Sequence, residues 1–536
     1  MVSGRTDAAD AADAVDAADA AERRASLGRF VPAIAVGAVA VVVVANAWHD
    51  LMPGVGFWDT GEFQTVLPVM GTAHPTGYPT YVLLGFVANL LLAPLGEPAF
   101  RINVLSLLAV AAAAGLTVEL VRRLSGSIAL GLAAGLGLAL TPDVWQNATR
   151  ADPHPIHLLF VALVLLLLVA WEEARKAGRA HADRWLIAAG ATFGLSAGNH
   201  SLTLLLAPAI GLYVLAVHPG IVRRPRLVAG CAAAVAITVV GVYLELPIRA
   251  GLIPAPLVYG NPSTWDGFWY IALAEQFRGS LVDPLGDLPS KAVDLWVLTQ
   301  AQFGVLSPLV PLGFLAALRR VPRYALLTGV AMVATVVFDA GYVNADINRY
   351  YLGPILWAWT WLAILGGVIV DALAWAWATL SRVQPAVVEA GTRVAAVVIA
   401  IVLLLPAVSE LDVRSAAADR SQDTGAAQWL DAVLPVIAPN AVLVSWWSTS
   451  TPLWYAQDVE GRRTDIDVVD DRTIIDRGYG SAIGTISHFF GTRPVYIIRA
   501  NDQDLAQVSA AYQLQPVAGS GSLEVYEVLG PAAAPG

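Results

Sequence analysis

The chain has 536 residues, of which 57% are hydrophobic and only 14% are charged, and its formal net charge is −10. Soluble proteins carry about a quarter charged residues, so this composition excludes a single soluble domain of this length. Because the chain lacks basic, aromatic-rich segments, no nucleic acid is expected among its partners. The single cysteine, Cys231, excludes an intrachain disulfide and a zinc site built from cysteines.

The N-terminal segment is polar and repetitive, with Asp-Ala-Ala-Asp repeats followed by arginines. This composition predicts a disordered cytoplasmic tail over residues 1–28. The apolar run 31–47 ends in Ala45-Asn46-Ala47, which is typical of a signal-peptide cleavage site. The run is long for a signal peptide and follows an acidic tail, so we expect a retained first transmembrane helix.

Apolar runs recur as far as residue 409 and predict a mainly α-helical polytopic membrane protein with about 11 transmembrane helices. Lys and Arg residues concentrate at the span ends that an N-inside orientation places in the cytoplasm. The run 80–95 would reverse this orientation if it crossed the membrane, so we expect it to lie in the interface. The predicted spans are residues 31–48, 102–121, 127–145, 156–172, 185–198, 202–217, 227–246, 304–318, 324–341, 351–370 and 393–409.

The chain changes character after residue 409. Short apolar runs such as 441–445 and 495–498 alternate with helical patterns such as 503–513, which predicts a C-terminal soluble α/β domain over residues 410–536. The transmembrane domain then covers residues 29–409. An odd number of spans places the C-terminal domain outside the cell, and we expect a multi-pass protein of the plasma membrane with an extracytoplasmic site.

Two acids lie just after the first span, in the predicted outer loop 49–101. Asp59 and Glu62 are three residues apart, so one helical turn would put both on the same face. Carboxylates beside a bilayer cost free energy and are rare without a function. The motif that follows contains His74 and Tyr78. This loop is therefore the first candidate for an active site.

Further polar clusters occur at outer ends of the predicted spans. Charged and aromatic residues anchor helix ends in any membrane protein, so each cluster alone has a structural explanation. Several on the same side of the membrane favour a functional site. They are Arg150 with Asp152, His154 and His157; Asn199 with His200; and Asp346 and Asn348 with Arg349 and Tyr350. A second large outer loop, about 247–303, is rich in Trp, Tyr and Pro and contains Trp265.

A metal site is the alternative use of one of these clusters. Asp152, His154 and His157 are possible ligands, and Asp59 could join them. Pro153 and Pro155 are expected to interrupt the helix that would align these side chains. We therefore predict no metal and no other required cofactor. The chain also contains no Walker motif and no Ser-His-Asp order.

Together these motifs resemble the GT-C superfamily of membrane glycosyltransferases, and within it the bacterial members of the protein O-mannosyltransferase-like family. The resemblance covers nearly the whole chain after residue 30. Its most specific part is the succession of the first two motifs. The matching segments are 59–62, 74–79, 101–106, 194–200, 348–351, 452–457 and 460–465.

The resemblance implies a GT-C-like fold and a glycosyltransferase that moves a sugar, with mannose favoured, from a polyprenyl-phosphate donor to a hydroxyl group. The reaction would invert the anomeric centre on the outer face of the membrane, and membrane lipids and a protein or glycan acceptor would be the partners. Asp59 would act as general base. The expected residues are Asp59, Glu62 and Asp152 for catalysis, His200, Arg349, Asn199 and Arg150 for the donor phosphate, and His74, Tyr78, Tyr350 and Trp265 for substrate binding.

One motif departs from the family pattern. The family has Ala-Glu-Val-Tyr in the second outer loop, where this chain has Ala151-Asp152-Pro153-His154. The acid is retained in a shorter form, and histidine replaces tyrosine.

Two other functions remain open from the sequence. A polytopic transporter or flippase for a lipid-linked or polar substrate would use the same acids along a pathway, although such charges are expected near the middle of the membrane. A surface sensor or scaffold would use the C-terminal domain, but it leaves the acids of the first loop unexplained.

Overall fold

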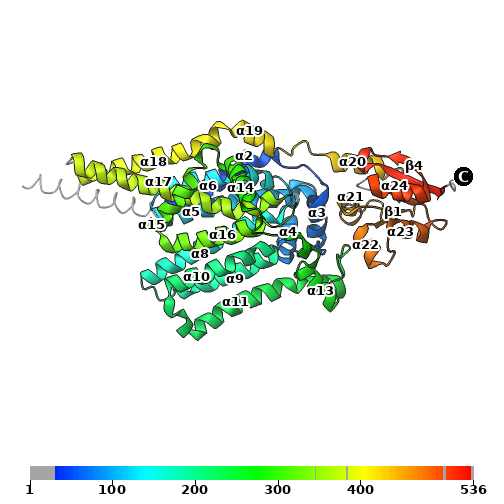
Figure 1. Ribbon diagram of the computed structural model, residues 1–536, viewed down its shortest axis with the longest axis horizontal. Helices are drawn as coiled ribbons and strands as arrows, with labels where there is room; N and C mark the ends of the chain where they lie inside the picture. Colours follow the sequence, from blue (N-terminus) through cyan, green and yellow to red (C-terminus); the bar gives the residue numbers. More distant parts are fainter. Residues whose placement is uncertain (1–29, 345, 382–383, 499–501, 533–536) are drawn as a thin grey trace, which may run out of the picture.

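The computed structural model describes residues 30–344, 346–381, 384–498 and 502–532. The predicted disordered tail, residues 1–28, lies outside these ranges. A bundle of long helices forms one part of the molecule and a small α/β domain caps one end of it (Figure 1). The fold class predicted from the sequence, a mainly α-helical polytopic membrane protein with a C-terminal α/β domain, is confirmed.

Seven helices of the described chain are long and apolar enough to cross a membrane, or up to nine if two bent pairs each count as one span. The seven segments are Val31–Asp50, Pro98–Ser125, Pro153–Lys176, Pro225–Leu252, Pro322–Asp339, Ile347–Leu380 and Pro385–Ser409. The bent pairs are Ile128–Ala139 with Pro142–Ala148, at 65°, and Leu288–Leu306 with Leu309–Arg320, at 80°. The count of about 11 therefore stays a prediction.

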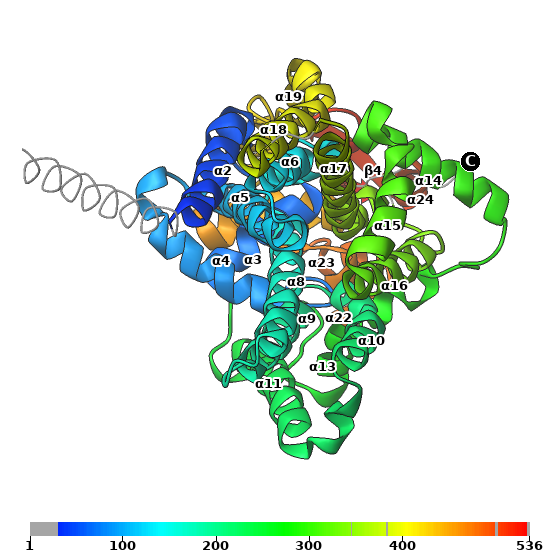
Figure 2. The same cartoon turned by 90° about the vertical axis from the view of Figure 1, so that its left-hand side faces the viewer.

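Many helices of the bundle, seen end-on in Figure 2, pack around one large apolar cluster, and α3 and α4 contribute to a second one. Their bounds are α2 Val31–Ala47, α3 Trp58–Val69, α4 Pro79–Leu91, α5 Pro98–Ser125, α6 Ile128–Ala139, α7 Pro142–Ala148, α8 Pro153–Lys176, α9 Asp183–Asn199, α10 Ala207–Val217, α11 Pro225–Tyr243, α12 Glu245–Pro247, α13 Trp265–Ala272, α14 Leu288–Phe303, α15 Leu309–Arg320, α16 Pro322–Asp339, α17 Leu352–Ser381, α18 Pro385–Ser409 and α19 Leu411–Ala418.

Helix ends follow from local sequence. Helix α5 begins at Pro98 and ends before Gly126, whose φ of 78° is the left-handed conformation that a glycine adopts without strain. Helix α8 begins at Pro153, with Asp152 as its N-cap. The expectation that Pro153 and Pro155 interrupt a helix is therefore wrong, because a proline in the first turn has no intrahelical N–H partner to lose.

Helix α4 has 13 residues, which span about 20 Å at 1.5 Å per residue. This is shorter than the hydrocarbon core of about 30 Å. Leu84, Val87, Leu90 and Leu91 are exposed along it. The helix is thus too short for a straight span, and its interfacial position remains a prediction.

The C-terminal domain contains a five-stranded sheet of order β2-β1-β3-β5-β4. Strands β1, β2 and β3 are parallel, with Leu443 opposite both Val468 and Tyr496, whereas β5 and β4 are antiparallel. The elements are α20 Gly425–Val433, β1 Val442–Val444, α21 Trp447–Trp454, β2 Asp467–Val469, α22 Asp471–Asp476, α23 Ala482–Phe489, β3 Val495–Ile497, α24 Asp502–Ala511, β4 Tyr512–Ala518 and β5 Val525–Pro531.

The two parts of the molecule are packed together. Val55 and Ala99, from the first loop and the start of α5, belong to the same buried cluster as Leu430 and Leu453 of the C-terminal domain. The carboxyl ends of β1 and β2 point toward the bundle, and ligands commonly bind at such strand ends in open α/β sheets.

Candidate active site

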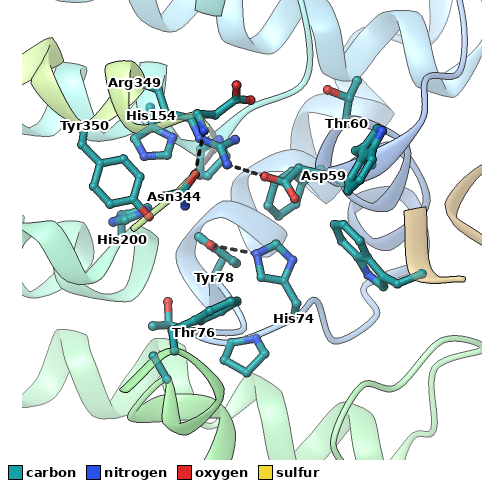
Figure 3. A pocket seen from close by; sticks show the side chains of 18 of the residues that line it. Asp59, Thr60, His74, Thr76, Tyr78, His154, His200, Asn344, Arg349 and Tyr350 are labelled. Atoms are coloured by element: carbon teal, nitrogen blue, oxygen red, sulfur yellow. Dashed lines mark hydrogen bonds and ion pairs between the residues drawn. The ribbon is translucent and has the colours of Figure 1, made fainter. Parts of the chain in front are cut away.

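A cavity of about 820 Å³ lies between the helical bundle and the C-terminal domain. Asp59 and His74 of the first loop line it, as do Arg349 and Tyr350 of the segment η8 Ile347–Tyr351 (Figure 3). Trp447, at the start of α21, also lines it. These residues are far apart in the sequence, so the fold assembles this cavity from both domains.

Asp59 lies in the first turn of α3 and is held by an arginine. Arg349 Nη2 donates to Asp59 Oδ2 over 2.6 Å. Burial alone would raise the pKa of Asp59, but the charges of Arg349 and His74 outweigh burial, and the pKa is lowered. Asp59 is therefore an ionised carboxylate on the cavity wall.

Asp152 lies on the other side of the same arginine. Arg349 Nη1 donates to Asp152 Oδ2 over 3.1 Å, while Asp152 Oδ1 accepts from the backbone N–H of His154 over 2.8 Å and faces its Nδ1 at 2.6 Å. Burial raises the pKa of Asp152, but His154 and Arg349 lower it further than burial raises it. Asp152 is almost fully buried and does not line the cavity, so this geometry suits a positioning residue.

Glu62 is also behind the cavity wall. It follows Asp59 on α3 but is 1% exposed, whereas Asp59 faces the cavity. Glu62 Oε1 accepts from the backbone N–H of His74 over 2.8 Å, and Oε2 contacts His74 Nδ1. Burial lowers the pKa of His74, but Glu62 raises it more, so the net shift is upward. Glu62 therefore orients His74, which does line the cavity, and favours its protonated form.

Histidine and tyrosine rings continue the cavity wall beyond Arg349. His154 lies 4.5 Å from His200 and 5.1 Å from Tyr350, measured between ring centroids, and Tyr78 Oη is 3.1 Å from His74 Nε2. Burial, followed by the nearby His154 and His157, lowers the pKa of His200 well below its ordinary value. A neutral His200 can offer a hydrogen bond to a phosphate but no positive charge.

The remaining predicted residues divide into those that reach the cavity and those that do not. Arg150 lines it. Asn199 is buried and its Nδ2 donates to the carbonyl of Pro153 over 3.0 Å, so it ties α9 to α8. Trp265, in α13, is 74% exposed and is not among the residues that line the cavity.

The structure adds cavity residues that the sequence did not indicate. Trp58 is 59% exposed, with a left-handed φ of 58°, a conformation that costs a bulky residue about 1–3 kcal/mol. Its ring centroid lies 6.2 Å from that of Trp447. Arg420 and Asp471 also line the cavity. The position of Asp471 shortly after strand β2 was the one available signal, because strand ends in α/β domains meet at one edge.

The described residues contain no group of three or more His, Cys, Asp or Glu side chains arranged to hold a metal ion. Asp152 and His154 are bonded to each other, and His157 Nδ1 is 3.2 Å from Thr203 Oγ1. That the protein works without a metal ion stays a prediction.

Comparison with known proteins gives matches in sequence and in structure. Residues 59–220 match the family described as "Protein O-mannosyl-transferase TMEM260 N-terminal domain". Protein O-mannosyl-transferase TMEM260 of Mus musculus is 32% identical over 248 residues, which are 44% of this chain and 33% of that protein. The match thus spans about a third of the length of this curated relative.

Two solved structures share the fold over most of the chain. ArnT from Cupriavidus metallidurans, bound to undecaprenyl phosphate, has a TM-score of 0.56 at 17% identity, covering 92% of this chain and 97% of ArnT. The Archaeoglobus fulgidus oligosaccharyltransferase, tethered with an acceptor peptide, has a TM-score of 0.52 at 14% identity, covering 91% of this chain and 69% of its own. The resemblance inferred from the motifs, to GT-C glycosyltransferases and to the protein O-mannosyltransferase-like family, is confirmed.

Proposed function

We propose that this chain, which has the fold of GT-C membrane glycosyltransferases, transfers a sugar from a polyprenyl-phosphate donor to a hydroxyl group of an acceptor. The observation that carries the proposal is Asp59, an ionised carboxylate on the wall of a large cavity and held there by Arg349. A hydroxyl group is a poor nucleophile, and a carboxylate within hydrogen-bond distance can accept its proton.

The proposed reaction is a single displacement. The acceptor oxygen attacks the anomeric carbon and gives its proton to Asp59 as the new carbon–oxygen bond forms. The bond between the anomeric carbon and the phosphate oxygen breaks, and the polyprenyl phosphate leaves with the bonding electrons. Attack opposite to the leaving group inverts the anomeric centre. Asp152 acts as a positioning residue, because it holds the arginine that orients Asp59.

Similarity to known proteins supports the proposed classes of donor and acceptor. ArnT, which shares the fold, was solved with undecaprenyl phosphate, and the curated relative is named an O-mannosyl-transferase. These matches support a polyprenyl-phosphate donor and mannose as the sugar. The fold is also shared by an oligosaccharyltransferase solved with an acceptor peptide, which supports a protein acceptor, with a glycan as the alternative.

The proposed location is the outer face of the plasma membrane. The excess of Lys and Arg at one set of helix ends supports an N-inside orientation. The cavity lies at the opposite end of α8 from Arg175 and Lys176, between the bundle and the C-terminal domain. Both the cavity and this domain are then extracytoplasmic, where a lipid-linked donor and a secreted acceptor could meet.

Reconstitution provides the test. The protein is placed in liposomes with polyprenyl-phosphate mannose that carries a radiolabel in the sugar, together with membrane proteins or glycans of its own cell. We expect label to move to an acceptor and free polyprenyl phosphate to accumulate in equal amount. Passage of the intact donor across the membrane without sugar transfer would instead support a flippase.

A further inference from the structure

We infer that Arg150 and Arg420 form an oxyanion site on the cavity wall that receives the phosphoryl group of the lipid donor. This inference rests on the proposed function and deepens it, because it moves the phosphate away from Arg349. Arg420 lies in the link between α19 and α20, outside every motif named above.

Three distant segments meet at this site. The backbone N–H of Met52 donates to the carbonyl of Thr149 over 2.9 Å, and Thr149 Oγ1 donates to the carbonyl of Ala418 over 3.1 Å. The N–H of Arg420 donates to the carbonyl of Asp50 over 2.8 Å. These bonds bring the residues that precede Arg150 and Arg420 together, and both arginines line the cavity with Met52.

The guanidinium groups of this site have only weak counter-charges. Arg150 Nη2 is 3.4 Å from Asp346 Oδ2, and Arg420 Nη1 is 3.9 Å from Asp423 Oδ2. Both aspartate side chains are exposed, by 57% and 41%, so water screens these pairs. The Nε atom of each arginine is buried without a hydrogen-bond partner among the described residues. Two arginines that line one cavity from adjoining segments, each with only an exposed counter-charge, favour a bound anion.

Arg349 offers a poorer place for the phosphate. Its two terminal nitrogens are bonded to Asp59 and Asp152, so one positive charge already faces two negative charges. A phosphate added there would meet an excess of negative charge, and like charges at a few ångströms repel strongly in a cavity of low dielectric constant. Arg349 and the other two arginines thus have different roles. Arg349 orients the carboxylate of Asp59, whereas Arg150 and Arg420 bind the leaving phosphate.

Measurements of lipid binding to the full-length protein in lipid nanodiscs test these separate roles of the arginines. The probes are undecaprenyl phosphate, undecaprenol, which lacks the phosphate, and inorganic phosphate as competitor. The variants are Arg150→Gln and Arg420→Gln, which keep the backbone bonds of these segments. Arg462→Gln is the matched control, because Arg462 pairs with Asp431 and Glu460 and does not line the cavity.

We expect each cavity variant to weaken undecaprenyl phosphate binding about tenfold or more, as for loss of a charged hydrogen bond. The cavity variants should bind undecaprenol and unfold thermally as the wild-type protein does. The control variant should bind undecaprenyl phosphate with unchanged affinity, and Arg420→Lys should recover part of the affinity that Arg420→Gln loses. Inorganic phosphate should compete with undecaprenyl phosphate in the wild-type protein and no longer in Arg420→Gln, because both phosphate groups would occupy the same site.

Two outcomes separate the failure of this inference from that of the proposed function. If the wild-type protein prefers undecaprenyl phosphate to undecaprenol and both variants keep that preference, the arginine site is overturned while the donor class stands. If the wild-type protein binds both lipids equally, the donor class itself fails.

Discussion

Arg349 Nη2 lies 2.6 Å from Asp59 Oδ2, although the two residues are 290 positions apart in the chain. The same guanidinium reaches Asp152 with its other terminal nitrogen. A fork that binds two carboxylates in different directions fixes the orientation of both. The position of Asp59 therefore depends on the junction of α16 with α17 as much as on its own helix.

Replacing Asp59 by Asn tests the proposed base. The amide keeps the shape of the side chain but cannot accept the proton, so we expect turnover to fall by about two orders of magnitude or more. Donor binding should change little. Sugar transfer in the purified variants is the measurement, and Glu97→Gln, an exposed acid of the same loop that does not line the cavity, is the control. Wild-type turnover in Asp59→Asn would remove Asp59 from the mechanism.

Removal of Arg349 should change the pH dependence of transfer. Burial raises the pKa of Asp59, and Arg349 is the largest influence that lowers it. In Arg349→Gln the pKa should therefore rise, and the acid limb of the kcat/KM profile should move upward by about one pH unit or more. Arg349→Lys keeps the charge but loses the forked guanidinium. The acid limb of its kcat/KM profile should therefore lie between those of the wild-type protein and Arg349→Gln. An acid limb that stays in place would show that Asp59 ionisation does not control the rate.

The Glu62–His74 pair should make stability depend on pH. The pKa of His74 is raised in the folded protein. The pair therefore stabilises the folded state fully below the ordinary histidine pKa of about 6.5, and this stabilisation is lost as the pH rises through the pKa that His74 has in the folded protein. We expect Glu62→Gln to lower the unfolding temperature most at acidic pH, by an amount equivalent to about 3–5 kcal/mol, and less at high pH.

Thermal unfolding in detergent at several pH values measures this difference. Glu389→Gln is the control, because Glu389 forms an exposed pair with Arg393 that is worth little. A destabilisation of Glu62→Gln that does not vary with pH would mean that His74 is uncharged in the folded protein.

Trp58 and Trp447 should contribute to acceptor binding. Their rings form an edge-to-face pair at the cavity, one from each domain, and aromatic faces stack well on sugars and peptides. We expect Trp58→Ala and Trp447→Ala to raise the acceptor KM about tenfold, the equivalent of about 1.4 kcal/mol, without changing hydrolysis of the donor by water. Trp265→Ala, at an exposed position away from the cavity, should have neither effect. Equal loss of both activities would indicate a folding role instead.

The orientation of the chain in the membrane can be measured without an activity assay. With the N-terminus inside, a reporter that is active only in the cytoplasm should be silent when fused after residue 536 and active when fused between Lys176 and Asp183. The opposite pattern would place the cavity in the cytoplasm and exclude an extracytoplasmic acceptor.

The sequence predicted which regions form the site better than it predicted the role of each residue. Asp59 and Arg349 were selected because charged groups at the ends of apolar helices are costly and rare, and His74 because it belongs to the motif that follows Asp59. Their spacing could not show that Glu62 and Asp152 lie behind the wall, because the face of a helix that meets the cavity depends on its neighbours. Arg420 and Trp58 gave no signal, because their role arises from contacts between distant segments.

The same limit applies to the fold. Apolar runs identified the helices, but the 65° and 80° bends cannot be read from hydropathy, so the number of spans was not fixed. Strand β4 was missed, since its residues Tyr512–Ala518 include two glutamines and Pro516. It is an edge strand with register shifts, where proline and polar residues are tolerated.

The packing of α3 on α21 makes the two domains depend on each other. The hydroxyl of Thr65 donates to the carbonyl of Thr451 over 3.4 Å, and Tyr455 Oη accepts from the N–H of Ala99 over 3.1 Å. A Cβ atom at Gly61 would clash with the carbonyl oxygen of Gly56 and would also lie 2.8 Å from Thr451 Oγ1. A chimera that combines this bundle with a relative's C-terminal domain should therefore work only if the graft carries small side chains opposite Gly61. Exchanging acceptor preferences between relatives will require α3 and α21 to be transplanted as one unit.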